Sequence, residues 1–185
     1  MNTAVIVYNL RRFIFISLSM SLLFLLTACP GEEDCFDLGS TTRVNDLILL
    51  TPKQTEYSQG DEVTLSLSIP ATNSYFGNEI NLFQETGDDS ALLILGFNQL
   101  FLDNHLSFIN GDEGNSESNN WYIAYYNQDS QKYELEIEIS LDRVGQYSFY
   151  SDSFIDFDGG GCNKFSINTN VLWEGVDLIE FTVVE

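Results

Sequence analysis

Residues 132–141 read KYELEIEISL, and this stretch decides the fold class. Apolar side chains occupy every second position from Tyr133 to Leu141, and polar side chains, mostly glutamates, stand between them. A period of two is that of a β-strand with one buried and one solvated face. Because parallel strands covered on both faces read as continuous apolar runs, the alternation favours an antiparallel sheet.

The same alternation occurs at residues 63–69 and 179–183. Less regular strand candidates lie at residues 46–50, 79–84, 92–102, 121–126, 145–150 and 164–169. Turn-rich pieces stand between them, as at residues 110–115 and 156–161, and no long segment has helical spacing. About nine strands with short turns predict one all-β domain over residues 43–185, a sandwich or barrel, of which we favour the antiparallel β-sandwich.

Two short stretches favour one kind of sandwich. Residues 59–65, QGDEVTL, resemble the start of the second strand of immunoglobulin-like domains, and residues 144–149, VGQYSF, resemble their penultimate strand. The resemblance implies an immunoglobulin-like fold in which the Tyr147 hydroxyl bonds back to nearby backbone. The domain is about 40 residues longer than that family's typical size, so a jelly roll is the alternative.

The first 28 residues have the composition of an export signal. Arg11 and Arg12 are followed by an apolar stretch over residues 13–26, and no acidic residue occurs among them. This length suits the helical signal peptide of a secreted protein and falls short of the roughly 20 residues that span a bilayer. Residues 26–29, LTAC, resemble the lipobox of bacterial lipoproteins. The resemblance implies cleavage between Ala28 and Cys29 and lipid attached to Cys29.

Lipid on Cys29 would anchor the mature chain to a membrane, since each buried methylene contributes about 0.8 kcal/mol and two or more acyl chains hold stably. Residues 29–42 form an acidic tether. Its Glu32-Glu33-Asp34 run resembles the surface-export signal of lipoproteins in one large Gram-negative phylum, and a solvated linker is the alternative. We expect an outer-membrane location, at the cell surface if the export interpretation holds.

The charge of the mature chain excludes several partners. The full chain has 7 basic and 28 acidic residues, and loss of Arg11 and Arg12 leaves 5 basic against 28 acidic, a formal charge of −23. Nucleic acid and anionic lipid headgroups would be repelled. The expected partners are therefore the membrane, through the lipid anchor, and a glycan or an envelope protein.

Two cysteines remain once Cys29 carries lipid. In an oxidising compartment Cys35 and Cys162 are expected to pair, with two free thiols as the alternative. A bridge over 127 positions would stabilise the fold by about 5 kcal/mol on the chain-entropy model.

Catalytic signals are weak. His105 is the only histidine and lies beside Asp103 and Asn104 in an expected turn. A serine hydrolase would need this histidine next to a nucleophilic serine, but the sequence contains no Gly-x-Ser-x-Gly motif. One histidine and two paired cysteines cannot supply a zinc site. Paired carboxylates could support a glycan hydrolase, but 28 acidic residues produce such pairs by chance. We expect no enzyme, with an envelope glycan hydrolase as the alternative.

Calcium is the one cofactor with candidate ligands. Asp152, Asp156 and Asp158 precede three glycines that could turn backbone carbonyls toward an ion. The spacing does not fit an EF-hand, and an acidic surface turn is the alternative.

Two further features suggest binding or modification. The densest aromatic group is Trp121, Tyr122, Tyr125 and Tyr126, which strand alternation divides between two faces. One face is expected to be core, and the other either a platform for sugar rings or a packing surface for a loop. Residues 89–91, DSA, resemble the O-glycosylation acceptor of the same phylum, which implies that Ser90 lies in an exposed loop. The expected function is a non-catalytic binding or structural accessory module, and a protective spacer is a third alternative.

Overall fold

The alternating stretch forms the long strand β11 (Lys132–Ser140), which pairs antiparallel with β4 (Glu62–Pro70) over nine residue pairs. Inward residues meet inward residues across this ladder, as in the pairs Leu135 with Leu67 and Ile137 with Leu65. All four of these side chains are at most 2 % exposed. Each such burial contributes about 1.5–3 kcal/mol, so this pair of strands is the centre of the core.

The computed structural model describes residues 39–96, 99–115, 120–159, 163–173 and 178–185, all within one compact unit, Asp37–Glu185. The remaining strands are β1 (Ser40–Arg43), β2 (Ile48–Thr51), β3 (Glu56–Ser58), β5 (Thr72–Asn73), β6 (Ile80–Asn81), β7 (Ser90–Leu95), β8 (His105–Asn110), β9 (Asp112–Glu113), β10 (Trp121–Asn127), β12 (Gly145–Tyr150), β13 (Asp152–Asp158), β14 (Lys164–Leu172) and β15 (Leu178–Val184). The helices are α2 (Leu82–Thr86) and α3 (Gln99–Leu102). Among the described residues, no helix is long and apolar enough to cross a membrane.

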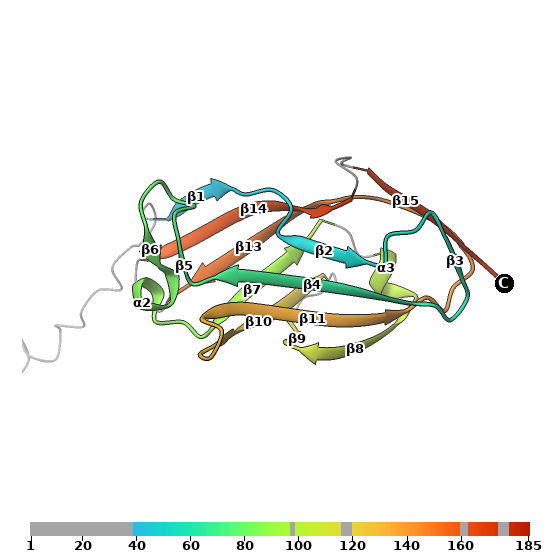
Figure 1. The fold of residues 1–185 in the computed structure, drawn as a ribbon, viewed down its shortest axis with the longest axis horizontal. Helices are drawn as coiled ribbons and strands as arrows, with labels where there is room; N and C mark the ends of the chain where they lie inside the picture. Colours follow the sequence, from blue (N-terminus) through green and yellow to red (C-terminus); the bar gives the residue numbers. More distant parts are fainter. Residues whose placement is uncertain (1–38, 97–98, 116–119, 160–162, 174–177) are drawn as a thin grey trace, which may run out of the picture. The chain divides into compact units, whose positions relative to one another are not determined.

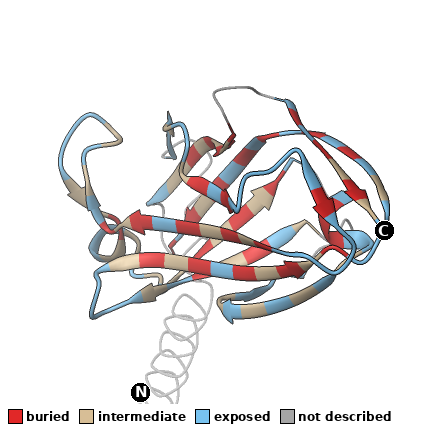
Figure 2. Ribbon diagram, turned by 45° about the vertical axis from the view of Figure 1, so that its right-hand side comes forward, coloured by how far each residue is buried: buried red, intermediate tan, exposed pale blue. Residues whose placement is uncertain are grey.

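Seven of the described strands close into a ring. The order β11-β4-β2-β14-β13-β7-β10 is continuous, and β10 returns to pair with β11. The edge strands β8, β9 and β1 extend this sheet, while β12, β15 and β3 form a separate three-stranded sheet (Figure 1). Figure 2 shows buried residues alternating with exposed ones along the strands, because inward side chains fill the core.

The all-β prediction is confirmed, and the antiparallel prediction holds for most pairings. It is wrong for three pairs: β1 with β14, β2 with β14, and β3 with β15 all run parallel. Local alternation does not encode strand direction, since it reports only that one face of each strand is buried.

Three predicted segments differ from the structure. Residues 79–84 divide between the short strand β6 and the first three residues of α2, where the Asn81 side chain accepts a hydrogen bond from the Gln84 amide and Gly87 closes the helix in the left-handed conformation. Residues 92–102 divide into the end of β7 and α3. The expected turn at residues 156–161 begins instead within the strand β13.

The tyrosine that the immunoglobulin resemblance singled out behaves as predicted. The Tyr147 hydroxyl donates to the Arg143 carbonyl oxygen at 3.1 Å, four residues upstream. Its ring is 3 % exposed and stacks on Phe181 with centroids 4.9 Å apart. This contact fixes the turn between β11 and β12.

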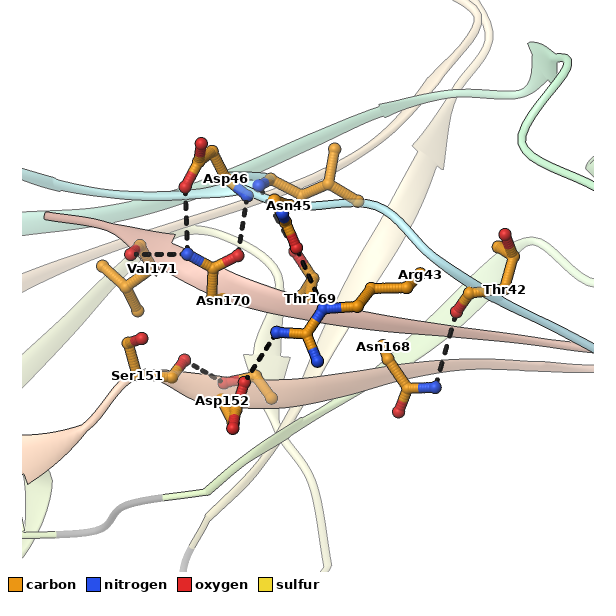
Figure 3. Close-up of polar contacts among 12 residues, drawn as sticks. Thr42, Arg43, Asn45, Asp46, Ser151, Asp152, Asn168, Thr169, Asn170 and Val171 are labelled. Atoms are coloured by element: carbon orange, nitrogen blue, oxygen red, sulfur yellow. Dashed lines mark hydrogen bonds and ion pairs between the residues drawn. The ribbon is translucent and has the colours of Figure 1, made fainter. Parts of the chain in front are cut away.

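A polar clamp holds the segment between β1 and β2 against β14 (Figure 3). The Asp46 backbone amide donates to the Asn170 side-chain oxygen at 3.0 Å, and the Asn170 amide donates back to the Asp46 carboxylate at 2.9 Å. Nearby, the Arg43 guanidinium contacts Asp152 at 3.3 Å. Side chains thus replace the backbone hydrogen bonds between strands where the chain leaves β14, between the parallel pairings of β1 and β2 with that strand. β1 itself begins inside the segment that was expected to be the tether.

Candidate functional site

An exposed patch of apolar side chains covers the outer side of three neighbouring ring strands, β10, β7 and β13. We call it the apolar face, and its members are Leu92, Ile94, Trp121, Ile123, Tyr125 and Phe154. Strand register places Trp121 beside Ile94 and Ile94 beside Phe154, which makes one row across the strands. Paired residues of a sheet point to the same side, so these three side chains form one continuous surface.

The aromatic members of the face are open to solvent. Trp121 is 37 % exposed, Tyr125 39 % and Phe154 49 %. With about 200 Å² for each complete side chain, the three rings leave roughly 250 Å² in contact with water. A contiguous patch of a few hundred Å² on a monomer often has a function.

A second row of the face ends in carboxylates. Asp112 pairs with Ile123, Ile123 with Leu92, and Leu92 with Asp156. The Tyr125 hydroxyl donates to Asp112 at 2.7 Å, and this hydrogen bond raises the pKa of Tyr125 above its ordinary value. The hydroxyl of Ser166, on β14, donates to Asp156 at 2.6 Å. The two carboxylates are therefore held at opposite ends of an aliphatic row.

The four aromatics named for a sugar platform divide between two faces, as strand alternation predicts. Trp121 and Tyr125 point outward and belong to the apolar face, as one of the two expected sides. Tyr122 is 1 % exposed and packs on Phe101, with centroids 5.0 Å apart. Tyr126 is half-buried and stacks on Phe83 at 4.3 Å. The platform is therefore wrong for Tyr122 and Tyr126, which alternation turns toward the core.

Sequence reasoning missed half of the face. Leu92, Ile94 and Phe154 come from strands distant in sequence from Trp121, and only the register joins them. Phe154 lies within an acidic stretch whose composition is also typical of a surface turn. The signal that could have found it is the alternation of Ser153, Ile155 and Phe157, which are all inward.

The outer side of β11 and β4 differs sharply from the apolar face. Glu134, Glu136 and Glu138 line the outer side of β11, and Tyr125 pairs directly with Glu134 at the boundary. Residues of β4 that pair with these glutamates are serines and a threonine. One side of the ring is thus acidic and polar, and the adjacent side is apolar.

The three aspartates proposed for calcium lie on strand β13 and not in a loop, so that part of the prediction is wrong. Asp152 and Asp156 are four residues apart, about 13 Å along a strand, which is too far to share one ion. Asp152 pairs with Arg43, and Asp158 pairs with Lys164 at 2.9 Å. In the described part of the chain, no group of three or more His, Cys, Asp or Glu side chains could hold a metal ion.

Other candidate residues have simpler settings. His105 is the first residue of β8, not a turn residue, and its backbone amide donates to the Asp142 carboxylate at 3.2 Å. Ser90 begins β7, is half-buried, and donates its hydroxyl to Asp88 at 2.9 Å, so the exposed loop expected there is a strand end. Ala28, Cys29, Cys35 and Cys162 lie outside the described residues.

Comparisons with known proteins give little guidance. No family model matches the chain, and no curated protein matches it. A similar solved structure is that of AggA, the major subunit of aggregative adherence fimbriae type I from Escherichia coli. It is 12 % identical, the match covers 77 % of this chain and 99 % of that one, and the TM-score is 0.35. A likeness this distant assigns no function.

Proposed function

We propose that the mature chain is a non-catalytic binding module of the cell envelope, held on the outer membrane by lipid on Cys29, and that the apolar face holds its ligand. The observation that carries the proposal is the Trp121, Ile94 and Phe154 row, which exposes two large aromatic rings on a rigid sheet. All six members lie on strands of the closed ring, so the surface exists before any ligand arrives.

The immunoglobulin-like sandwich is the finer description that we propose for the fold. The Tyr147 hydroxyl bond to the Arg143 carbonyl supports it, since that corner recurs in such domains. An experimental structure in which β12, β15 and β3 face the β4 and β11 pair across one shared core would agree with it. A structure that retains only the seven-strand ring would contradict it.

The anchor can be tested directly. Mass spectrometry of the native protein is expected to find the leader removed and acyl groups on Cys29. A Cys29→Ala variant should leave the membrane fraction, and protease treatment of intact cells reports whether the domain is at the surface. A native protein with an unmodified Cys29 or an intact leader contradicts the proposed location.

Binding by the face is tested with immobilised mature protein and solubilised envelope material. We expect Trp121→Ala and Phe154→Ala each to reduce the material retained. Leu49→Ala is the matched control, because Leu49 is 39 % exposed and lies on β2, three ring strands away from β10. Equal retention by all four proteins rejects the apolar face as the binding surface.

The alternative function is hydrolysis of envelope glycans by two carboxylates, which lie about 5–9.5 Å apart in such enzymes. Incubation of the purified domain with polysaccharides separates the two functions, because a binding module leaves the chains at their original length. Release of reducing ends, abolished by an Asp→Asn or Glu→Gln variant, would favour the hydrolase.

A further inference from the structure

We infer that the ligand of the apolar face is an uncharged glycan chain, an inference that rests on the proposed binding function. The chain lies along the row of Trp121, Ile94 and Phe154, with its ring faces on the two aromatics. Its edge hydroxyl groups reach the neighbouring row, which ends in Asp112 and Asp156.

The dimensions of the face suit a chain of sugar rings. Trp121 and Phe154 are two strand spacings apart, about 10 Å, with Ile94 between them. The carboxylate row lies two residues further along each strand, about 7 Å away. A ligand that covers both rows must offer flat apolar surfaces in succession and polar groups along one edge. Sugar rings linked in a chain have this combination.

The size of the face argues against a protein partner. A stable protein interface buries about 800 Å² on each side, with 20–30 residues. The three exposed rings offer roughly 250 Å², and the aliphatic members between them are already half-buried. Beyond the row, the surface becomes the acidic outer side of β11.

Charge argues against an anionic glycan and against a second copy of the chain. The mature protein has a formal charge of −23, and both Asp112 and Asp156 border the face itself. Self-association would bring these like charges together, and an anionic polysaccharide would meet the same repulsion. An uncharged ligand avoids this cost.

The two carboxylates are positioned to accept hydrogen bonds from hydroxyl groups. Asp112 is held through its Oδ2 by Tyr125, and Asp156 through its Oδ1 by Ser166. Among the described residues, neither carboxylate has a hydrogen bond or an ion pair at its second oxygen. Each is therefore oriented by the protein and able to accept from a ligand hydroxyl, and hydrogen bonds to charged acceptors are the stronger kind.

The test uses native electrophoresis of the mature protein in gels that contain envelope polysaccharide. The polysaccharide is treated with protease and fractionated to remove acidic chains, and a second sample is oxidised with periodate, which cleaves vicinal diols. We expect retardation by the first sample and none by the second. Trp121→Ala and Phe154→Ala should each weaken binding about tenfold, because each removes one stacking ring. Asp156→Asn should weaken it less, and Leu49→Ala should leave it unchanged.

Each other outcome has a definite meaning. If the envelope material binds only before protease treatment, the glycan inference fails and the binding function stands with a protein ligand. If sedimentation finds a dimer that Phe154→Ala dissociates, the occupant is a second copy. If the acidic fraction binds and the neutral fraction does not, the charge argument is wrong. If neither the treated nor the untreated material binds, or if the face variants bind like the unaltered protein, the proposed function fails as well. Urea unfolding of each variant confirms that it is folded.

Discussion

Gly111 joins β8, which pairs with β11, to β9, which pairs with β10. Its replacement by alanine tests whether this connection needs a residue without a side chain. Its φ of 94° lies in the region that residues with a Cβ rarely adopt. A Cβ at this position would overlap the Ile123 carbonyl oxygen and the Leu135 side chain. Because one of these obstacles is backbone, β10 itself must move to accommodate it.

The expected loss has two parts. A left-handed conformation costs a residue with a Cβ about 1–2 kcal/mol. Forcing packed neighbours apart costs a further 1–3 kcal/mol, roughly. Gly111→Ala should therefore lower the free energy of unfolding by about 2–5 kcal/mol. Gly60→Ala is the matched control: its φ is 86° and nothing lies within 4 Å of its Cβ, so it should lose only about 1–2 kcal/mol.

Urea unfolding, followed by tryptophan fluorescence and by far-UV circular dichroism, measures both free energies if the slopes of the transitions agree. Gly111→Ala should unfold at the lower urea concentration. It should also bind the ligand of the apolar face more weakly, since Ile123 belongs to that face. Equal stability of the two variants would refute the argument that close backbone approach, and not φ alone, requires glycine at position 111.

Three further outcomes follow from the same structure. Tyr147→Phe removes the hydroxyl that bonds the Arg143 carbonyl and should cost about 1 kcal/mol, a fall in Tm of about 2–4 °C, whereas Tyr150→Phe at a 69 % exposed position should change neither. Burial raises the pKa of Tyr133 to about 12 and also raises the pKa of Tyr122, while the unfolded chain ionises near 10. The free energy of unfolding should therefore fall between pH 10 and 12, because only the unfolded state loses these protons in that range. Tyr133→Phe should make the fall shallower. Urea midpoints that are constant up to pH 12 would contradict this prediction. Calorimetric titration with calcium should show no saturable heat and no shift in Tm, because the β13 aspartates do not converge, and a saturable site would show that the strand rearranges.

Much of the secondary structure follows from the sequence. The alternation at residues 132–141, 63–69 and 179–183 correctly predicts β11, β4 and β15, since a pleated strand buried on one face requires that pattern. The same alternation correctly places Trp121 and Tyr125 on the opposite side of their strand from Tyr122 and Tyr126, although it does not say which side is core. The export signal, the lipid anchor and the disulfide remain predictions, because they concern residues that the structure does not describe.

Predictions from short segments were wrong where the same residues suit more than one secondary structure. Residues 79–84 have strand-like composition, yet only Ile80 and Asn81 are a strand, and the Asn81 cap and Gly87 make the last three residues the start of α2. Residues 152–158 have the aspartates of a turn, yet Ser153 and Phe154 are placed inward and outward by their neighbours in the sheet. In the first case a local cap decides, and in the second the neighbouring strands decide, because a few residues carry too little intrinsic preference to override either.

The sequence by itself determined that the chain is all-β, strongly acidic and built from strands with one buried face, because charge and alternation are properties of neighbouring residues. Only the tertiary structure decided that β10 returns to β11 to close the ring, that β1 and β2 run parallel to β14, and that Phe154 lies in one row with Trp121. Register and strand order are set by packing between segments that can lie more than a hundred residues apart, so no local pattern contains them.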